Sequence, residues 1–115
     1  MDDIDAVMTL VALGQTTRLH TFRLLVQAGP EGLHAGHLAE ALGVPRNTMS
    51  SHFGILSRAK LINSERFGRK IVYRVNLSRL AELTAFLVAG CCGGRREICE
   101  PLIDMIAGIR KATSV

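Results

Sequence analysis

Three cysteines, all that this chain contains, lie together in the segment CCGGRREIC. Cys91 and Cys92 are adjacent, and Cys99 closes the segment. Three is an odd number, and adjacent cysteines bridge to each other only with strain. In a reducing compartment, clustered thiols are more often metal ligands or redox groups than structural disulfides. The spacing therefore indicates a site that binds a thiophilic ion or changes its oxidation state.

The composition favours one helical domain. Of the 115 residues, 48% are apolar and 4% aromatic, and tryptophan is absent, which predicts an aliphatic core of packed helices. A chain of this length can bury one modest core, so residues 1–115 are expected to form a single domain. The apolar runs are short, and the N-terminus MDDIDAV is acidic where a signal peptide would be basic. We therefore expect a cytoplasmic protein that does not enter a membrane.

Helical periodicity covers most of the chain, with one stretch of alternating residues between helices. The predicted helices cover residues 3–13, a segment capped by Thr16 or Thr17 and ending at Gly29-Pro30, residues 35–42, and a segment from Pro45 to about Ala59. The runs LINSERF and RKIVYRV, on either side of Gly68, predict an antiparallel β-hairpin. Helical spacing returns over 78–89 and again over 101–111. The predicted fold class is mainly α with one hairpin.

Apolar residues at helical spacing mark the predicted stripes of the first two helices. They are Ile4, Val7, Met8 and Val11 in the first helix, and Leu19, Phe22, Leu25 and Val26 in the second. The segment 78–89 is apolar nearly all round, which is typical of a helix buried on more than one side. One small core cannot cover both sides of this helix, so we expect a partner subunit to cover the second side.

The segment HLAEALGVPRNTMSSHFGILSRAKLI predicts two short helices around a tight Gly43-Val44 turn, the helix-turn-helix pattern. Polar side chains crowd the start of its second helix, at Arg46, Asn47, Thr48, Ser50, Ser51 and His52. Arginine and asparagine can make bidentate hydrogen bonds with guanine and adenine edges, and serine and threonine suit bases or phosphates. A solvated helix face could carry the same residues, so this segment alone leaves both interpretations open.

The hairpin favours the first interpretation. Arg66, Arg69 and Lys70 cluster at its tip, where a turn needs only glycine and polar residues. A basic hairpin directly after a helix-turn-helix makes a winged helix, whose wing contacts the phosphate backbone or the minor groove. Charged residues also occur on hairpins to stop an exposed strand edge from pairing with another chain. That role would explain why the residues are basic, but not why they cluster at the tip. Together with a net charge of +4, the pattern predicts binding to double-stranded DNA.

From about Thr17 to Asn76 the chain resembles the ArsR/SmtB family of metal- and metalloid-responsive repressors. The residues that carry the resemblance are TTRLHTFRLL, LAEALGVPRNTMSSHFGILSRAKLI and FGRKIVYRV. The resemblance implies a winged helix-turn-helix homodimer, not an enzyme, with 3–13 and 78–111 as dimerisation elements. It also implies a palindromic operator with half-sites about 34 Å apart, one helical turn of DNA.

Inducer sites differ among members of this family. A metalloid site with Cys-x-Cys at the start of the third helix is missing, because GLHAGHL has His34 and Gly36 at those positions. A zinc site on the C-terminal helices is missing too, because 78–111 contains no histidine. Some arsenic-responsive members have a Cys-Cys pair after the last long helix and a third cysteine further on. The segment 91–99 is similar to theirs, which implies As(III) or Sb(III) bound by Cys91, Cys92 and Cys99.

The chemistry of the segment agrees with this resemblance. Soft thiolates select thiophilic ions, and trivalent arsenic or antimony takes three sulfur ligands on one side of a pyramid. Gly93-Gly94 lets the chain fold back so that Cys99 can supply the third sulfur. Arg95 and Arg96 favour the thiolate form. Zinc usually takes four ligands, and the segment offers no fourth cysteine and no nearby histidine.

Other interpretations of these cysteines stay open. Free cysteines also occur as small buried hydrophobes, although Gly-Gly-Arg-Arg indicates an exposed loop. Another soft metal would use the same thiols, and a redox or persulfide switch would need only two of them. A small thiol oxidoreductase is the alternative from another class. Such enzymes place the reactive cysteine at a helix N-terminus, whereas this pair follows a helix C-terminus, where the dipole disfavours a thiolate.

Overall fold

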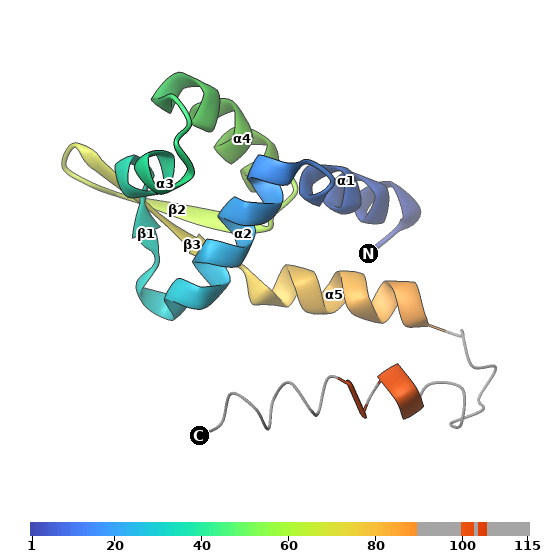
Figure 1. The fold of residues 1–115 in the computed structure, drawn as a ribbon. Coiled ribbons are helices and arrows are strands. Elements are labelled where there is room, and N and C mark those ends of the chain that lie inside the picture. The colour runs from blue at the N-terminus through green and yellow to red at the C-terminus, as the bar shows by residue number, and fades with distance from the viewer. Residues whose placement is uncertain (90–99, 103, 106–115) are drawn as a thin grey trace. The chain divides into compact units, whose positions relative to one another are not determined.

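The computed structural model describes residues 1–89, 100–102 and 104–105. Its elements, in chain order, are α1 (Asp3–Leu13), α2 (Thr16–Ala28), the 3-10 turn η1 (Gly29–Glu31), β1 (Leu33–His34), α3 (Ala35–Leu42), α4 (Arg46–Arg58), β2 (Ile62–Phe67), β3 (Lys70–Val75) and α5 (Leu77–Val88) (Figure 1). Residues 100–102 and 104–105 are helical. The chain divides into two compact units, Met1–Leu83 and Thr84–Val115. The mainly helical fold with a small hairpin confirms the predicted fold class.

Residues at the helix ends explain where the helices begin and end. Asp2 caps α1 by accepting a hydrogen bond from the Asp5 backbone N–H, at 2.8 Å. Gln15 caps α2 by accepting from the Arg18 N–H at 2.9 Å, so the prediction of a Thr16 or Thr17 cap was wrong. A glutamine side chain reaches the free N–H groups as well as a threonine does here, and Thr16 becomes the first helical residue.

Proline and glycine bound the next two helices. Gly43 ends α3 in the left-handed conformation, with φ of 64°. Pro45 is the N-cap residue of α4 and lies just before the helix, not inside its first turn as the sequence suggested. Extended backbone at Pro45 turns the chain into α4 and leaves Arg46 as the first helical residue.

The sheet has three antiparallel strands in the order β1-β3-β2. Phe67 pairs with Lys70 across the hairpin, which leaves a two-residue loop whose Gly68 has φ of 62°. The sequence predicted this hairpin but missed β1, because a two-residue strand has no periodicity. A Cβ on Gly32 would collide with the Tyr73 carbonyl oxygen, so a glycine there lets β1 approach β3.

The core lies between α2, α3, α4 and the sheet. Met49, Phe53 and Leu56 of α4, whose helical spacing places them on one side of the helix, are buried. The Phe53 ring stacks on Tyr73 of β3, with centroids 4.1 Å apart, so α4 packs against the hairpin. Burial raises the pKa of Tyr73 above its ordinary value, which keeps the phenol neutral. The position of α4 relative to the wing is therefore fixed by aromatic packing.

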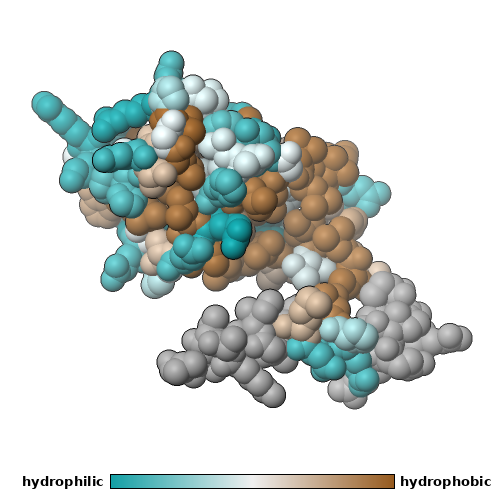
Figure 2. All heavy atoms as spheres, in the orientation of Figure 1, coloured by the Kyte–Doolittle hydropathy of each residue, from teal (hydrophilic) through white to brown (hydrophobic). Residues whose placement is uncertain are grey.

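Most of the large apolar residues of α1, including the four at the predicted helical spacing, point away from this core. The buried residues of α1 are Ala6, Thr9 and Ala12, which let the helix approach its neighbours closely. Ile4, Val7, Met8 and Val11 are exposed, with Ile4 at 76%. Figure 2 shows apolar surface, in brown, over α1. On α2, Phe22 and Leu25 are buried as predicted, whereas Leu19 and Val26 are exposed.

In the described part of the chain, no helix is long and apolar enough to cross a bilayer.

Candidate nucleic-acid interface

Helices α3 and α4 with the turn between them form a helix-turn-helix. The Val44 N–H donates to the Ala39 carbonyl at 3.0 Å and the Gly43 N–H to that of Glu40 at 3.2 Å, so the turn satisfies the free carbonyls of α3. Met49 and Phe53 anchor the inner side of α4 in the core. The start of α4 is thereby held rigidly with its polar side outward.

The predicted polar residues at this start are placed on the surface with one exception. Arg46, Asn47, Thr48, Ser50 and Ser51 are exposed, and His52 is half-buried. Ser50 Oγ donates to the Arg46 carbonyl at 3.0 Å, and Asn47 Oδ1 accepts from the Thr48 N–H at 3.0 Å. Their remaining donors and acceptors are available to a partner.

His52 contacts the body of the protein. Its Nδ1 lies 3.3 Å from Arg18 Nη1. Arg18 also donates from Nε to the Ala12 carbonyl at 2.7 Å and from Nη2 to that of Val11 at 3.3 Å, which completes the end of α1. The sequence gave no signal for this role of Arg18, because its side-chain partners come from two other helices, α1 and α4.

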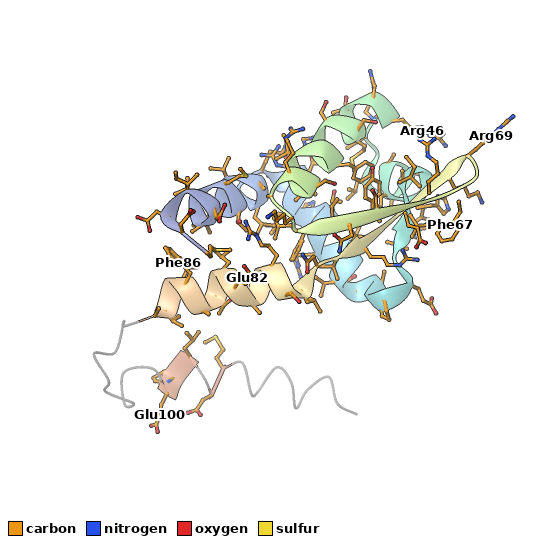
Figure 3. The ribbon with its side chains drawn as sticks, turned by 180° about the vertical axis from the view of Figure 1, so that it is seen from behind. Arg46, Phe67, Arg69, Glu82, Phe86 and Glu100 are labelled. Atoms are coloured by element: carbon orange, nitrogen blue, oxygen red, sulfur yellow. The ribbon has the colours of Figure 1, made fainter. Side chains whose placement is uncertain are left out.

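The hairpin tip carries the other predicted residues. Arg66, Arg69 and Lys70 are exposed, and Arg69 occupies the two-residue loop. Figure 3 shows Arg46 and Arg69 extending from α4 and the hairpin tip on the same side of the protein. We call the exposed residues at 46–48, 50–51, 66 and 69–70 the basic surface.

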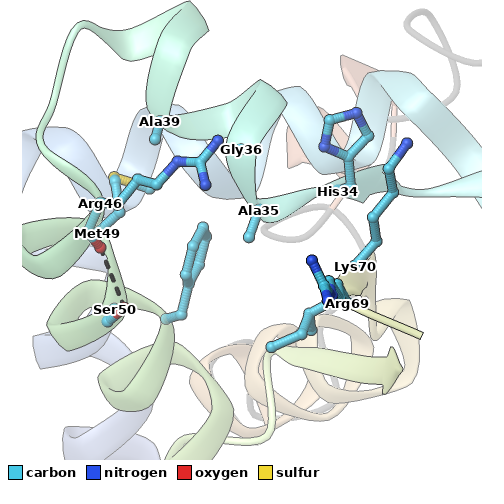
Figure 4. Close-up of a pocket in the computed structure, with 11 residues that line it drawn as sticks. His34, Ala35, Gly36, Ala39, Arg46, Met49, Ser50, Arg69 and Lys70 are labelled. Atoms are coloured by element: carbon cyan, nitrogen blue, oxygen red, sulfur yellow. Dashed lines mark hydrogen bonds between the residues drawn. The ribbon is translucent and has the colours of Figure 1, made fainter. Parts of the chain in front are cut away.

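A cavity of about 340 Å³ lies within the basic surface, between α3, α4 and the hairpin (Figure 4). Arg46 and Ser50 line one side, and Arg69 and Lys70 line the other. Within the described residues, no carboxylate pairs with the side chains of Arg46, Arg69 or Lys70. The structure therefore brings cations from two elements together and leaves their charge for a partner.

Cys91, Cys92 and Cys99 lie outside the described residues. Among the residues that are described, no group of three histidine, cysteine or acidic side chains is placed to hold a metal ion. His34 and His37 do lie close together, with ring centroids 5.8 Å apart. His34 Nδ1 accepts the His37 backbone N–H at 3.2 Å, so this histidine caps α3.

Comparison with known proteins agrees with this geometry. A family model described as a helix-turn-helix domain matches residues 13–65. No curated protein matches the chain. Among solved structures, the chain is similar to an ArsR-like transcriptional regulator from Rhodococcus sp. RHA1, with 24% identity, a TM-score of 0.64 and coverage of 97% of this chain and 96% of that chain.

Two further structures are slightly more similar in sequence. One is titled a possible transcriptional regulator for arsenical resistance, with 28% identity, a TM-score of 0.60 and coverage of 69% of this chain and 79% of that chain. The other is the AntR antimony-specific transcriptional repressor, with 28% identity, a TM-score of 0.57 and coverage of 70% of this chain and 72% of that chain.

A helix-turn-helix followed by a basic hairpin, held on a helical core, defines a winged helix-turn-helix protein. The chain is similar to ArsR-like transcriptional regulators of this fold. The matching structures are named as transcriptional regulators, and the matching family model is a helix-turn-helix domain.

Proposed function

We propose that this protein is a homodimeric repressor that binds a palindromic operator and leaves it when As(III) or Sb(III) binds its three cysteines. The observation that carries the DNA-binding part is the basic surface, where cations without an acidic partner in the described chain surround the exposed start of α4. A protein that acts on operator DNA is expected in the cytoplasm.

In this proposal the start of α4 enters the major groove. Asn47, Thr48, Ser50 and Ser51 then face base edges, with Arg46 beside them. Arg66, Arg69 and Lys70 contact phosphates, which would make affinity strongly salt-dependent. The rigid anchoring of α4 by Met49 and Phe53 supports this docking, because sequence recognition needs a fixed helix.

The proposed dimer interface uses residues 3–13 and 78–111. Its support is the apolar row on α1, where Ile4, Val7, Met8 and Val11 are exposed side by side at helical spacing. One similar structure is titled a homodimeric winged helix-turn-helix DNA-binding domain from Mycobacterium bovis. A two-fold dimer would present two copies of α4 to half-sites about 34 Å apart.

Val7→Glu tests this interface. Val7 is 58% exposed, so the substitution should leave the fold intact and convert the dimer to monomers in sedimentation. Val26→Glu is the matched control, since Val26 is 41% exposed on α2, outside the proposed interface. A wild-type protein that sediments as a monomer at micromolar concentration would contradict the dimer and the palindromic operator with it.

The proposed inducer site is the segment 91–99, with Cys91, Cys92 and Cys99 as ligands. Its support is the set of three thiols together with similarity to regulators named for arsenical resistance and antimony. Three sulfur bonds would constrain the segment that follows α5 and pull on the end of a proposed interface helix. A coupling of about 1–3 kcal/mol is sufficient, because it changes affinity roughly 5- to 150-fold.

The decisive experiment titrates the protein–DNA complex with arsenite, antimonite, cadmium and hydrogen peroxide in parallel. Cys91→Ser and Cys92→Ser should bind DNA like the wild type and fail to release it with arsenite, and Cys99→Ser should weaken the response. Release by cadmium or peroxide alone would favour the alternatives, another soft metal or a thiol redox or persulfide signal. If the triple serine variant still dissociates at the wild-type arsenite concentration, the inducer site lies elsewhere.

A further inference from the structure

The cavity in the basic surface has the composition of an anion site. Its inner wall is apolar, with Met49 and Phe53 almost fully buried, and its rim carries Arg46, Arg69 and Lys70. In the described chain none of the 11 lining residues is acidic. Three like charges around a partly apolar hollow repel one another, and a bound anion would relieve that repulsion.

A second observation concerns Gly36, which lies in the first turn of α3 and lines the same cavity. A Cβ at this position would lie 3.0 Å from Arg46 Nη2 and 3.6 Å from His34 Nδ1. The backbone of Gly36 has no left-handed conformation that would require glycine. The missing side chain therefore gives the Arg46 guanidinium room beside the start of α3, at the cavity rim (Figure 4).

The arrangement suits a phosphate group better than a carboxylate. Guanidinium groups from α4 and from the hairpin loop approach the cavity from different sides, and each can donate two N–H groups to a tetrahedral oxyanion. The nearby start of α3 adds the partial positive charge of a helix N-terminus. The volume of about 340 Å³ leaves room for the phosphate and the groups attached to it.

We infer that this cavity is a phosphate site, formed by Arg46, Arg69 and Lys70 with Gly36 as the space-giving residue. The inference deepens the proposed function: in the DNA complex the phosphate comes from the backbone where the strand passes from α4 to the hairpin. A free phosphate compound has the same chemistry and would compete for the site. Arg46 then binds a phosphate and not a guanine edge.

The first arm of the test uses the DNA-free protein and titrates it with inorganic phosphate and pyrophosphate, followed by calorimetry and phosphorus NMR. Gly36→Ala should lower the affinity about tenfold, because the alanine moves the guanidinium and removes a charge-assisted hydrogen bond. Arg69→Ala should lower it at least as much. The fold should be unaffected, since alanine is favoured over glycine in a helix.

Gly54→Ala is the matched control. Gly54 lies in α4, outside the cavity lining, and a Cβ there would lie 3.3 Å from Arg58 Nη1, another guanidinium. The same chemical change against the same kind of neighbour should leave phosphate affinity at the wild-type value.

The second arm measures how binding to duplex DNA depends on salt. Gly36→Ala changes no charge, yet it should make the dependence of log K on log salt less steep, by less than the roughly 0.9 of one whole phosphate, because Arg69 and Lys70 still face that phosphate. Gly54→Ala, also neutral, should keep the wild-type slope. A reduced slope without free-phosphate binding identifies the DNA backbone as the source of the phosphate, and free-phosphate binding with an unchanged slope identifies a soluble compound.

Wild-type behaviour of Gly36→Ala in both arms would overturn the inference. Failure of the proposed function looks different: the wild-type protein would then bind no duplex at any salt concentration. In that case phosphate and pyrophosphate titration alone decides whether the cavity is a phosphate site.

Discussion

Arginines in two regions of this protein have opposite surroundings. In the helical body, Arg79 is buried and donates from Nε to the Ala59 carbonyl at 3.1 Å, with Glu82 at 3.4 Å and Asp5 at 3.8 Å. On the basic surface, Arg46 and Arg69 have no acidic partner in the described chain and lie around a cavity. Arg79 therefore stabilises the fold, whereas Arg46 and Arg69 are available to bind a ligand.

The comparison shows why basic residues do not identify a DNA surface by number alone. Arg74 lies on the same hairpin as Arg69, but it donates to the Pro30 carbonyl at 3.0 Å and pairs with Glu65 at 2.7 Å. Its charge is therefore already used within the protein. The basic surface differs because its arginine and lysine side chains have no acidic partner among the described residues.

The largest effect is expected for Arg79→Met. The substitution leaves the buried Ala59 carbonyl without a donor and should lower the free energy of unfolding by about 3 kcal/mol, measured by urea denaturation. Asp5 and Glu82 are half exposed, so their charges stay solvated and add little to the loss. At a temperature where the variant is folded, its affinity for DNA should equal that of the wild type. If the variant were as stable as the wild type but bound DNA more weakly, Arg79 would belong with the DNA-binding arginines and the contrast between the two regions would be wrong.

Arg46→Ala should have the reverse profile. DNA affinity should fall by about 1–3 kcal/mol while the free energy of unfolding stays unchanged, because no carboxylate of the described residues pairs with the side chain. If Arg46 binds a phosphate, operator and random duplex weaken alike and the salt slope falls. A loss confined to operators with one particular guanine would assign Arg46 to a base edge and contradict the phosphate site.

The sequence predicts much of the division between the helical body and the basic surface. It does not predict the contacts that create this division. The spacing of Met49, Phe53 and Leu56 predicts the buried side of α4 and, with it, the exposed side. On α1 the spacing predicts the helix but not the side that faces the core, because large apolar residues surround small ones. Ala6 and Ala12 are buried since they permit close packing, a property of the neighbouring helices.

The cavity could not be predicted at all. It depends on Gly36 and Arg46 meeting across the helix-turn-helix and on a hairpin loop from a distant part of the chain. Single residues such as Arg69 were identified as candidates from their place in a turn. Their convergence on one hollow follows only from the register of the hairpin, in which Phe67 pairs with Lys70.

Lys70→Ala should have a smaller effect than Arg46→Ala. A lysine acts as a point charge without the fixed fork of a guanidinium, so its removal should weaken all DNA sequences alike. It should reduce the salt slope by less than the roughly 0.9 of one whole phosphate, because Arg46 and Arg69 still face that phosphate. Binding isotherms at several salt concentrations measure this directly. An unchanged slope would mean that Lys70 faces solvent in the complex.

The smallest effect is expected for His52→Ala, which tests the border between the two regions. His52 belongs by sequence to the polar start of α4, yet its Nδ1 lies 3.3 Å from Arg18, which completes the end of α1. The contact is long and half-buried, so its loss should lower the free energy of unfolding by about 0.5 kcal/mol, less than a short hydrogen bond from a charged donor contributes. In a double-mutant cycle with Arg18→Met, the two changes should be non-additive in stability, because they remove the same contact. DNA affinity should stay at the wild-type value. Additive stability changes combined with weaker DNA binding would instead assign His52 to the basic surface. Arg18 would then be the residue at which the helical body meets that surface.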